Sequence, residues 1–219
     1  MEPEETDFEE GANALPPEAF RRGDETPDEE FYRIPRLVTH LDEAAIGAVT
    51  QLYREYFPAN GAVLDLMSSW ISHLPPEVAY GRVAGLGMNW EELAANPRLT
   101  EFVVQNLNTD PRLPFEDNAF GGAGLCVSID YLTDPTAVLR EAGRVLKPGA
   151  PLVITFSNRC FPTKAIAIWH ALDDRGRIAL VQHFFADTGC FTAPQILDRS
   201  PQRGRSDPLY AVIGRKQRT

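Results

Sequence analysis

Residues 62–75 read AVLDLMSSWISHLP, and this segment decides the fold of the chain. It opens with an apolar run at 62–64 that is rich enough for a strand buried on both faces. Asp65 follows at once, then a turn of small polar residues, and a pair of prolines ends the segment. Open α/β sheets build nucleotide crevices in this way, outside the carboxyl ends of their strands. By itself the segment is equally compatible with an ordinary buried strand that ends in one acid.

Strand and helix patterns alternate on both sides of this segment, which is typical of a parallel, doubly wound sheet. We therefore predict an α/β fold: a mostly parallel, seven-stranded Rossmann-like sheet with helices on both faces. The expected strands are residues 62–66, 78–86, 101–105, 124–128, 152–156, 178–185 and 208–214. The expected helices are residues 42–57, 91–95, 134–147, 164–172 and 193–197.

The net charge of −10 lies entirely in the first thirty residues. Residues 1–30 hold twelve acids and two bases, whereas residues 31–219 hold nineteen of each. Such an acidic segment with few apolar residues buries too little surface to offset its ordering entropy. We predict a disordered acidic leader at 1–30, dispensable for folding, before one domain at 31–219. An acidic interaction tail is the alternative interpretation.

Composition narrows the class of protein. No apolar run reaches the roughly 18 residues of a membrane span, and the acidic start does not read as a secretory signal. The three cysteines, Cys126, Cys160 and Cys190, are odd in number and far apart, which favours neither a disulfide framework nor a metal site. The balanced charge of 31–219 disfavours nucleic acid as a partner. We expect a cytoplasmic protein, monomeric or homodimeric, that does not bind membranes or metals.

Four landmarks along the chain carry a more specific signal. They are VLDL at 63–66, LPFEDNAF at 113–120, the strand at 125–128 and REAGRVLKPGAPLVIT at 140–155. Their order and spacing resemble the type 11 branch of the class I S-adenosylmethionine (SAM) dependent methyltransferases, which includes the ubiquinone-biosynthesis C-methyltransferases. The resemblance is closest to an uncharacterised plant and bacterial subgroup with D-L-x-S-S-W-x-S-H in the first landmark. That family carries a Gly-x-Gly-x-Gly loop after the first acid, and Met67, Ser69 and Ile71 replace its glycines here.

The resemblance implies a set of cofactor-binding residues at the carboxyl ends of the first four strands. Asp65 would hold the SAM amino group, and Met67, Ser68 and Ser69 would form the turn beneath its methionine part. Gly87 stands where the family has an acid for the ribose, so Asn89 is expected to bind the ribose and Met88 to pack on the adenine. The remaining expected contacts are Asn106, Leu107, Asn108 and Ser128.

The same resemblance places the substrate pocket after the fourth and fifth strands, beneath an N-terminal segment. Asp130 and His183 are candidate bases, and Tyr131 is a candidate hydroxyl partner; these three are the expected catalytic residues. The expected substrate-binding residues are Tyr32, Arg36, Asn158 and Arg159. Capping, packing and surface pairing are the alternative roles of all these side chains.

The resemblance predicts a SAM-dependent enzyme that methylates a small molecule and releases S-adenosylhomocysteine (SAH). The lost glycines and acids leave an alternative open, a degenerate member that binds SAM or a related nucleoside without turnover. A dinucleotide oxidoreductase is disfavoured because no Gly-x-Gly-x-x-Gly follows the first strand.

Overall fold

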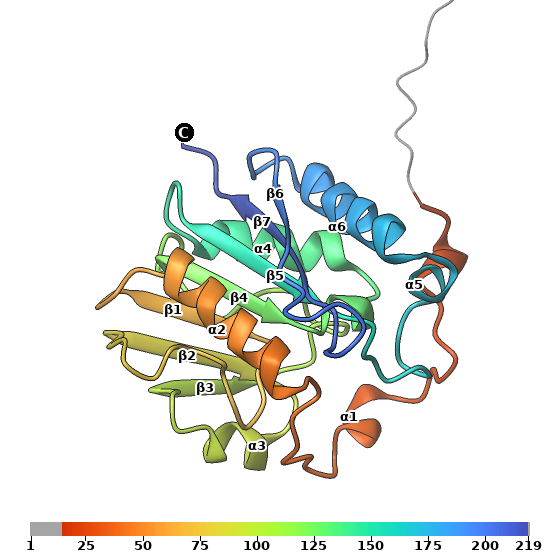
Figure 1. Ribbon diagram of the computed structural model, residues 1–219, viewed down its shortest axis with the longest axis horizontal. Coiled ribbons are helices and arrows are strands. Elements are labelled where there is room, and N and C mark those ends of the chain that lie inside the picture. The colour runs from red at the N-terminus through yellow and green to blue at the C-terminus, as the bar shows by residue number, and fades with distance from the viewer. Residues whose placement is uncertain (1–14, 219) are drawn as a thin grey trace, which may run out of the picture.

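A computed structural model describes residues 15–218, and its centre is a seven-stranded sheet in the order β3-β2-β1-β4-β5-β7-β6. Figure 1 shows this sheet with helices on both faces. Strands β1 to β5 run parallel to one another, and β7 runs antiparallel to both β5 and β6. The strands are β1 (Ala62–Leu66), β2 (Arg82–Gly87), β3 (Glu101–Val104), β4 (Gly122–Cys126), β5 (Pro151–Phe156), β6 (Gln195–Asp198) and β7 (Tyr210–Arg215). The predicted doubly wound α/β fold is confirmed.

Helices cover the two faces of the sheet and form one apolar layer on each. They are α1 (Asp28–Phe31), α2 (Glu43–Tyr56), α3 (Trp90–Ala95), α4 (Pro135–Val145), α5 (Ala167–Ala171) and α6 (Asp174–Thr188), with short 3₁₀ turns at Pro17–Phe20 and Ile129–Tyr131. Buried side chains of α2 pack with Val63 and Val153, whereas those of α4 and α6 pack with Leu64 and Leu152. Neighbouring residues of one strand thus serve opposite layers, as the alternation of a pleated strand requires.

Two of the sequence landmarks, at 113–120 and 140–155, meet in space and stabilise the end of α4. The Arg144 guanidinium donates to the carbonyl oxygens of Leu113 and Phe115, each at 2.8 Å, and pairs with Asp117 and Glu141, each at 2.7 Å. One planar cation with five donors can satisfy this many acceptors at once. The segment at 113–120 is therefore fixed to α4 and contributes to the frame of the domain.

The expected strand at 178–185 is wrong, because these residues belong to α6. Leu180, Val181, Phe184 and Phe185 are buried, at spacings that place them on one helix face. Asp173 caps the helix by accepting from the Gly176 N–H. A short apolar run fits a strand or a helix equally well, and the capping residues decide between them.

The expected short helix at 193–197 is also wrong. Residues Gln195–Asp198 form β6, which pairs antiparallel with β7 at the edge of the sheet. The pattern of residues 195–198 alone does not show that they pair with β7, which the tertiary structure reveals.

Residues 15–30, which the sequence analysis assigned to the acidic leader, are packed on the domain. Asp28 is buried and lies 2.7 Å from Arg22 and 3.2 Å from Lys164, whose side chain is fully buried. Asp24 lies 3.4 Å from the same ammonium group. Arg22 and Lys164 thus compensate the charges of Asp24 and Asp28, two of the acids of this segment. That residues 1–30 are dispensable for folding stays a prediction; the packing of 15–30 argues against it for those residues, and residues 1–14 lie outside the described part.

No helix among the described residues is long and apolar enough to cross a membrane.

Candidate functional site

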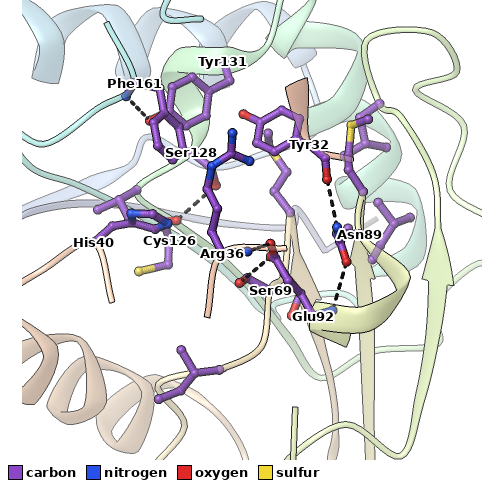
Figure 2. A pocket seen from close by; sticks show the side chains of 18 of the residues that line it. Tyr32, Arg36, His40, Ser69, Asn89, Glu92, Cys126, Ser128, Tyr131 and Phe161 are labelled. Atoms are coloured by element: carbon purple, nitrogen blue, oxygen red, sulfur yellow. Dashed lines mark hydrogen bonds between the residues drawn. The ribbon is translucent and has the colours of Figure 1, made fainter. Parts of the chain in front are cut away.

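A cavity lies outside the carboxyl ends of β1, β2, β3 and β4, where the strand order reverses between β1 and β4. Ligands of open α/β sheets bind at this switch point. The cavity measures about 390 Å³, and side chains of residues 32–41 line it from the N-terminal segment, which we call the roof (Figure 2). Within residues 15–218, no group of three or more His, Cys, Asp or Glu side chains could hold a metal ion.

The backbone is strained at the two strand ends that flank the switch point. Met67 follows β1 with a φ of 53°, and Val127 follows β4 with a φ of 44°. A side chain in this left-handed region costs roughly 1–2 kcal/mol, and such strain concentrates at functional sites. Met67 replaces the first glycine of the family loop, so the chain keeps the backbone turn of that loop without its usual residue.

The Asp65 carboxylate lies beneath this turn and accepts hydrogen bonds from two hydroxyl groups. Ser68 Oγ donates to Asp65 Oδ2 at 2.6 Å, and Ser72 Oγ donates to the same oxygen. Among the described residues no donor bonds its Oδ1, and no Lys or Arg pairs with it. Burial raises the pKa of the Asp65 carboxyl to about 6, although the two hydroxyls lower it. Among the described residues, no cation lies beside the buried Asp65 carboxylate to stabilise its charge.

Gly87 ends β2 at a point where no side chain fits. The Ser68 N–H donates to the Leu86 carbonyl at 2.7 Å, which brings the turn after β1 against the end of β2. A Cβ on Gly87 would lie 2.1 Å from the Ser68 carbonyl oxygen. The acid that the family carries here is therefore excluded by the path of the turn.

The three asparagines expected to contact the cofactor are largely engaged with the protein. Asn89 caps α3 by accepting from the Glu92 N–H, and its amide donates to the carbonyls of Tyr32 and Arg33. The Asn108 amide donates to Asp28 and to the Tyr131 carbonyl, and its oxygen accepts from Thr133. These amides fasten the roof and the neighbouring loops.

Asn106 is engaged in the same way: its amide donates to Glu29 and its oxygen accepts from the Asn108 N–H. The side-chain amide of Asn89, predicted to bind the ribose, already uses its N–H donors and its oxygen acceptor within the protein.

Glu92 is a cavity residue that the sequence analysis missed. Its carboxylate accepts from Ser69 Oγ at 2.8 Å and from the Arg36 N–H at 2.7 Å (Figure 2). A sequence signal existed, because Asn89 followed three residues later by Glu92 resembles a capping box. The Glu92 side chain turns away from the helix start and joins α3, the β1 turn and the roof.

The predicted substrate-side residues divide into two groups. Tyr32, Arg36, Tyr131 and Arg159 line the cavity together with Ser128. The Tyr131 hydroxyl accepts from the Phe161 N–H at 2.8 Å. Arg159 is at the rim, where its guanidinium pairs with Asp207 at 2.7 Å and remains 62% exposed.

Asn158, Asp130 and His183 do not line this cavity. Asp130 is buried beside it, and burial raises the pKa of its carboxyl to about 7. His183 lies on α6, 3.3 Å from Asp187, because the segment expected as a strand is a helix. The structure does not bring these two candidate bases into contact with the cavity.

The cavity carries two imidazoles instead, His40 from the roof and His73 from the segment after β1. Burial lowers the pKa of both, that of His73 to about 4, so both rings are neutral at pH 7. Buried His73 Nδ1 has no hydrogen-bond partner among residues 15–218.

Comparison with known proteins agrees with this architecture. Residues 47–154 match a family described as a methyltransferase domain, type 11. The chain is 32% identical over 136 residues to the ubiquinone/menaquinone biosynthesis C-methyltransferase UbiE of Bartonella quintana. That match covers 60% of this chain and 44% of the relative, so the chain spans less than half of the relative's length.

Two solved structures share the fold at low sequence identity. The [4+2]-cyclase SpnF superposes with a TM-score of 0.58 at 17% identity, covering 78% of this chain and 81% of that one. The phosphoethanolamine N-methyltransferase 2 of Haemonchus contortus, in complex with SAM, gives 0.57 at 13% identity, covering 78% and 52%. These likenesses concern the fold, and the family match concerns the sequence. Residues 47–154 of this chain are thus similar in sequence to the type 11 methyltransferase domain, and the sheet has the fold seen in a SAM-bound methyltransferase.

Proposed function

We propose that this protein transfers a methyl group from SAM to a small-molecule nucleophile. The observation that carries the proposal is Asp65, a deeply placed carboxyl beside the cavity with no cation from the described residues. An ammonium group would complete this site, because charge-assisted hydrogen bonds favour the ionised carboxylate.

The cavity residues fit a nucleoside with an amino-acid tail. Asp65, which lies behind the lining residues Ser68 and Ser72, and the Ser69 turn would hold the amino-acid end, and Met88 would pack on the base. Glu92 would accept from the ribose in place of the acid that Gly87 excludes, since a carboxylate accepts about four hydrogen bonds and this one uses two. When bound, SAM supplies an electrophilic methyl group on a sulfonium.

The chain's own residues position the nucleophile and receive its proton. Tyr131 and Phe161 form part of the cavity wall where β4 and β5 end, and restricting the nucleophile there raises its effective concentration. A neutral imidazole accepts a proton, and His40 presents one to the cavity at physiological pH. Its ring is held edge-to-face against Phe161, with centroids 5.1 Å apart.

Replacing Asp65 by asparagine tests the proposal at its centre. The variant keeps the shape and loses the charge, so SAM affinity should fall roughly ten- to a hundredfold, the value of one charge-assisted hydrogen bond. Isothermal titration calorimetry measures this, and Asp110→Asn is a matched control, because Asp110 is an exposed acid outside the cavity. If Asp65→Asn binds SAM as tightly as the parent, the Asp65 carboxyl is not the ammonium-binding group.

The pH dependence of SAM binding is a second test of the same group. Since the pKa of Asp65 is raised to about 6, the carboxyl is protonated below pH 6 and ionised above it. SAM affinity should therefore rise from pH 5 to pH 7, by at most about tenfold for each unit below the pKa, while the ligand's amino group stays charged. The slope should vanish in Asp65→Asn. A parent whose affinity is flat across this range contradicts the assignment.

A second candidate function is ligand binding without methyl transfer. Met67 occupies the glycine position of the loop, and the engaged asparagines leave fewer free contacts for the nucleoside. The fold is compatible with other chemistry, since SpnF is described as a [4+2]-cyclase. Incubation with methyl-tritiated SAM and a metabolite extract separates the two, because only the enzyme transfers label to a small molecule.

A further inference from the structure

The guanidinium of Arg36 lies at the centre of the aromatic part of the cavity. Its carbon atom is 4.5 Å from the ring centroid of Phe31, 5.8 Å from that of Tyr32 and 5.3 Å from that of Phe161. Figure 2 shows the side chain extending from the roof toward the rings of Tyr32 and Tyr131. Rings that surround a guanidinium fix its position by cation–π attraction.

This cation has no anionic partner within residues 15–218. Two of its five N–H groups are used: Nη2 donates to the Phe31 carbonyl at 2.9 Å, and Nη1 makes a long contact of 3.4 Å with the Ile34 carbonyl. No carboxylate of the described residues pairs with it, whereas Arg159 at the rim is paired with Asp207. Glu92 meets only the backbone N–H of Arg36. The remaining donors are available to a ligand.

Two tyrosine hydroxyls lie in the same part of the cavity lining. Tyr131 Oη accepts from the Phe161 N–H, which leaves its own proton to donate. Tyr32 Oη has no hydrogen-bond partner in the described chain. Burial raises the pKa of both hydroxyls, so both remain protonated donors at physiological pH. One cation and two neutral donors form a site for a negatively charged group.

The aromatic rings around this site favour a negatively charged group that is attached to a flat ring. Phe161 makes edge contacts with Tyr32 and His40 and a tilted contact with Tyr131. Aromatic walls favour a flat ring through offset or edge contacts, and a guanidinium matches a planar carboxylate with two parallel bonds.

We propose that Arg36, Tyr32 and Tyr131 form the binding site for the carboxylate of a flat, ring-bearing substrate. This inference deepens the proposed function and rests on it. The site lies toward β4 and β5, beyond the turn of Met67 and Ser69, so we assign it to the substrate and not to the amino-acid carboxylate of the cofactor.

The test uses the full-length chain, first titrated with SAH and then, when saturated, with 2-naphthoate or its neutral analogue 2-naphthamide. The parent should bind the carboxylate at least roughly tenfold more tightly than the amide, as one charge-assisted contact implies. Arg36→Gln should abolish this preference and leave SAH affinity unchanged. Arg33→Gln is the matched control, because Arg33 is an exposed arginine of the same segment outside the cavity.

Tyr32→Phe provides an independent variant, since it removes one hydroxyl and keeps the ring. It should weaken naphthoate binding by about three- to tenfold, the value of one neutral hydrogen bond, and should not change naphthamide binding. Equal binding of the two probes by the parent would overturn the inference. Loss of SAH affinity in Arg36→Gln would also overturn it and assign the site to the cofactor. If the parent does not bind SAH in the first titration, the proposed function is refuted, and this outcome is distinct from failure of the carboxylate site.

Discussion

Replacing Asp28 by alanine is expected to lower the free energy of unfolding by about 3–5 kcal/mol, the usual cost of removing one partner from a buried ion pair. Lys164, fully buried, would keep two backbone carbonyls and one carboxylate, Asp24 at 3.4 Å, and Arg22 would lose the carboxylate that accepts from its Nη1. The Asn108 amide would lose an acceptor as well. Chemical denaturation followed by circular dichroism measures the change.

Glu30→Ala is the matched control, because Glu30 is an exposed acid of the same helix. Exposed substitutions of this kind usually change stability by no more than about 0.5 kcal/mol. An Asp28→Ala protein within that range of the parent would mean that the N-terminal segment does not depend on this ion cluster.

The same cluster adds a pH dependence with a definite sign. Burial by itself would raise the pKa of Asp28, but hydrogen bonds from Asn108 and Arg22 outweigh it and hold the pKa below the ordinary value of 3.8. A carboxyl with a lowered pKa stabilises the fold above its unfolded pKa, and this contribution is lost as the pH falls through the lowered value. The parent should therefore lose stability below pH 4 more steeply than Asp28→Asn.

The central sheet could be predicted from the sequence because its signals are local. Apolar runs such as residues 62–64 and 152–156 are short and bounded by turns, and their alternation with helices implies parallel strands. Met67, Ser68 and Ser69, which the family resemblance placed in the site, line the cavity in the turn after β1.

The rest depends on partners that are distant in the chain. Asn89 reads as a ligand residue until the roof supplies Tyr32 and Arg33 as its acceptors. Residues 15–30 read as an excess of acid, and only the structure shows that Lys164, far along the sequence, pairs with Asp24 and Asp28. His183 reads as a strand residue near the site because a short apolar run fits a strand or a helix, and the cap at Asp173 is the signal that identifies the helix.

Gly87→Ala is expected to have the second large effect, and it tests whether the turn after β1 determines the shape of the site. The added Cβ would lie 2.1 Å from the Ser68 carbonyl oxygen, a backbone atom that moves only if the turn moves. Overpacking costs typically 1–3 kcal/mol and occasionally more, so we expect a loss of about 3 kcal/mol in the free energy of unfolding. The shifted turn carries Ser68 and Ser69, so SAM affinity should fall as well.

Gly47→Ala is the matched control for this substitution. Gly47 lies within α2, and an added Cβ there meets no atom within 4 Å. Alanine in a helix interior is more favourable than glycine by roughly 0.5–1 kcal/mol, so the control should gain stability and bind SAM like the parent. Gly87→Ala with parent stability but weakened SAM binding would mean that the turn yields at little cost and still shapes the site. If both properties stay unchanged, the turn is not held against β2, and the missing acid at position 87 needs another explanation.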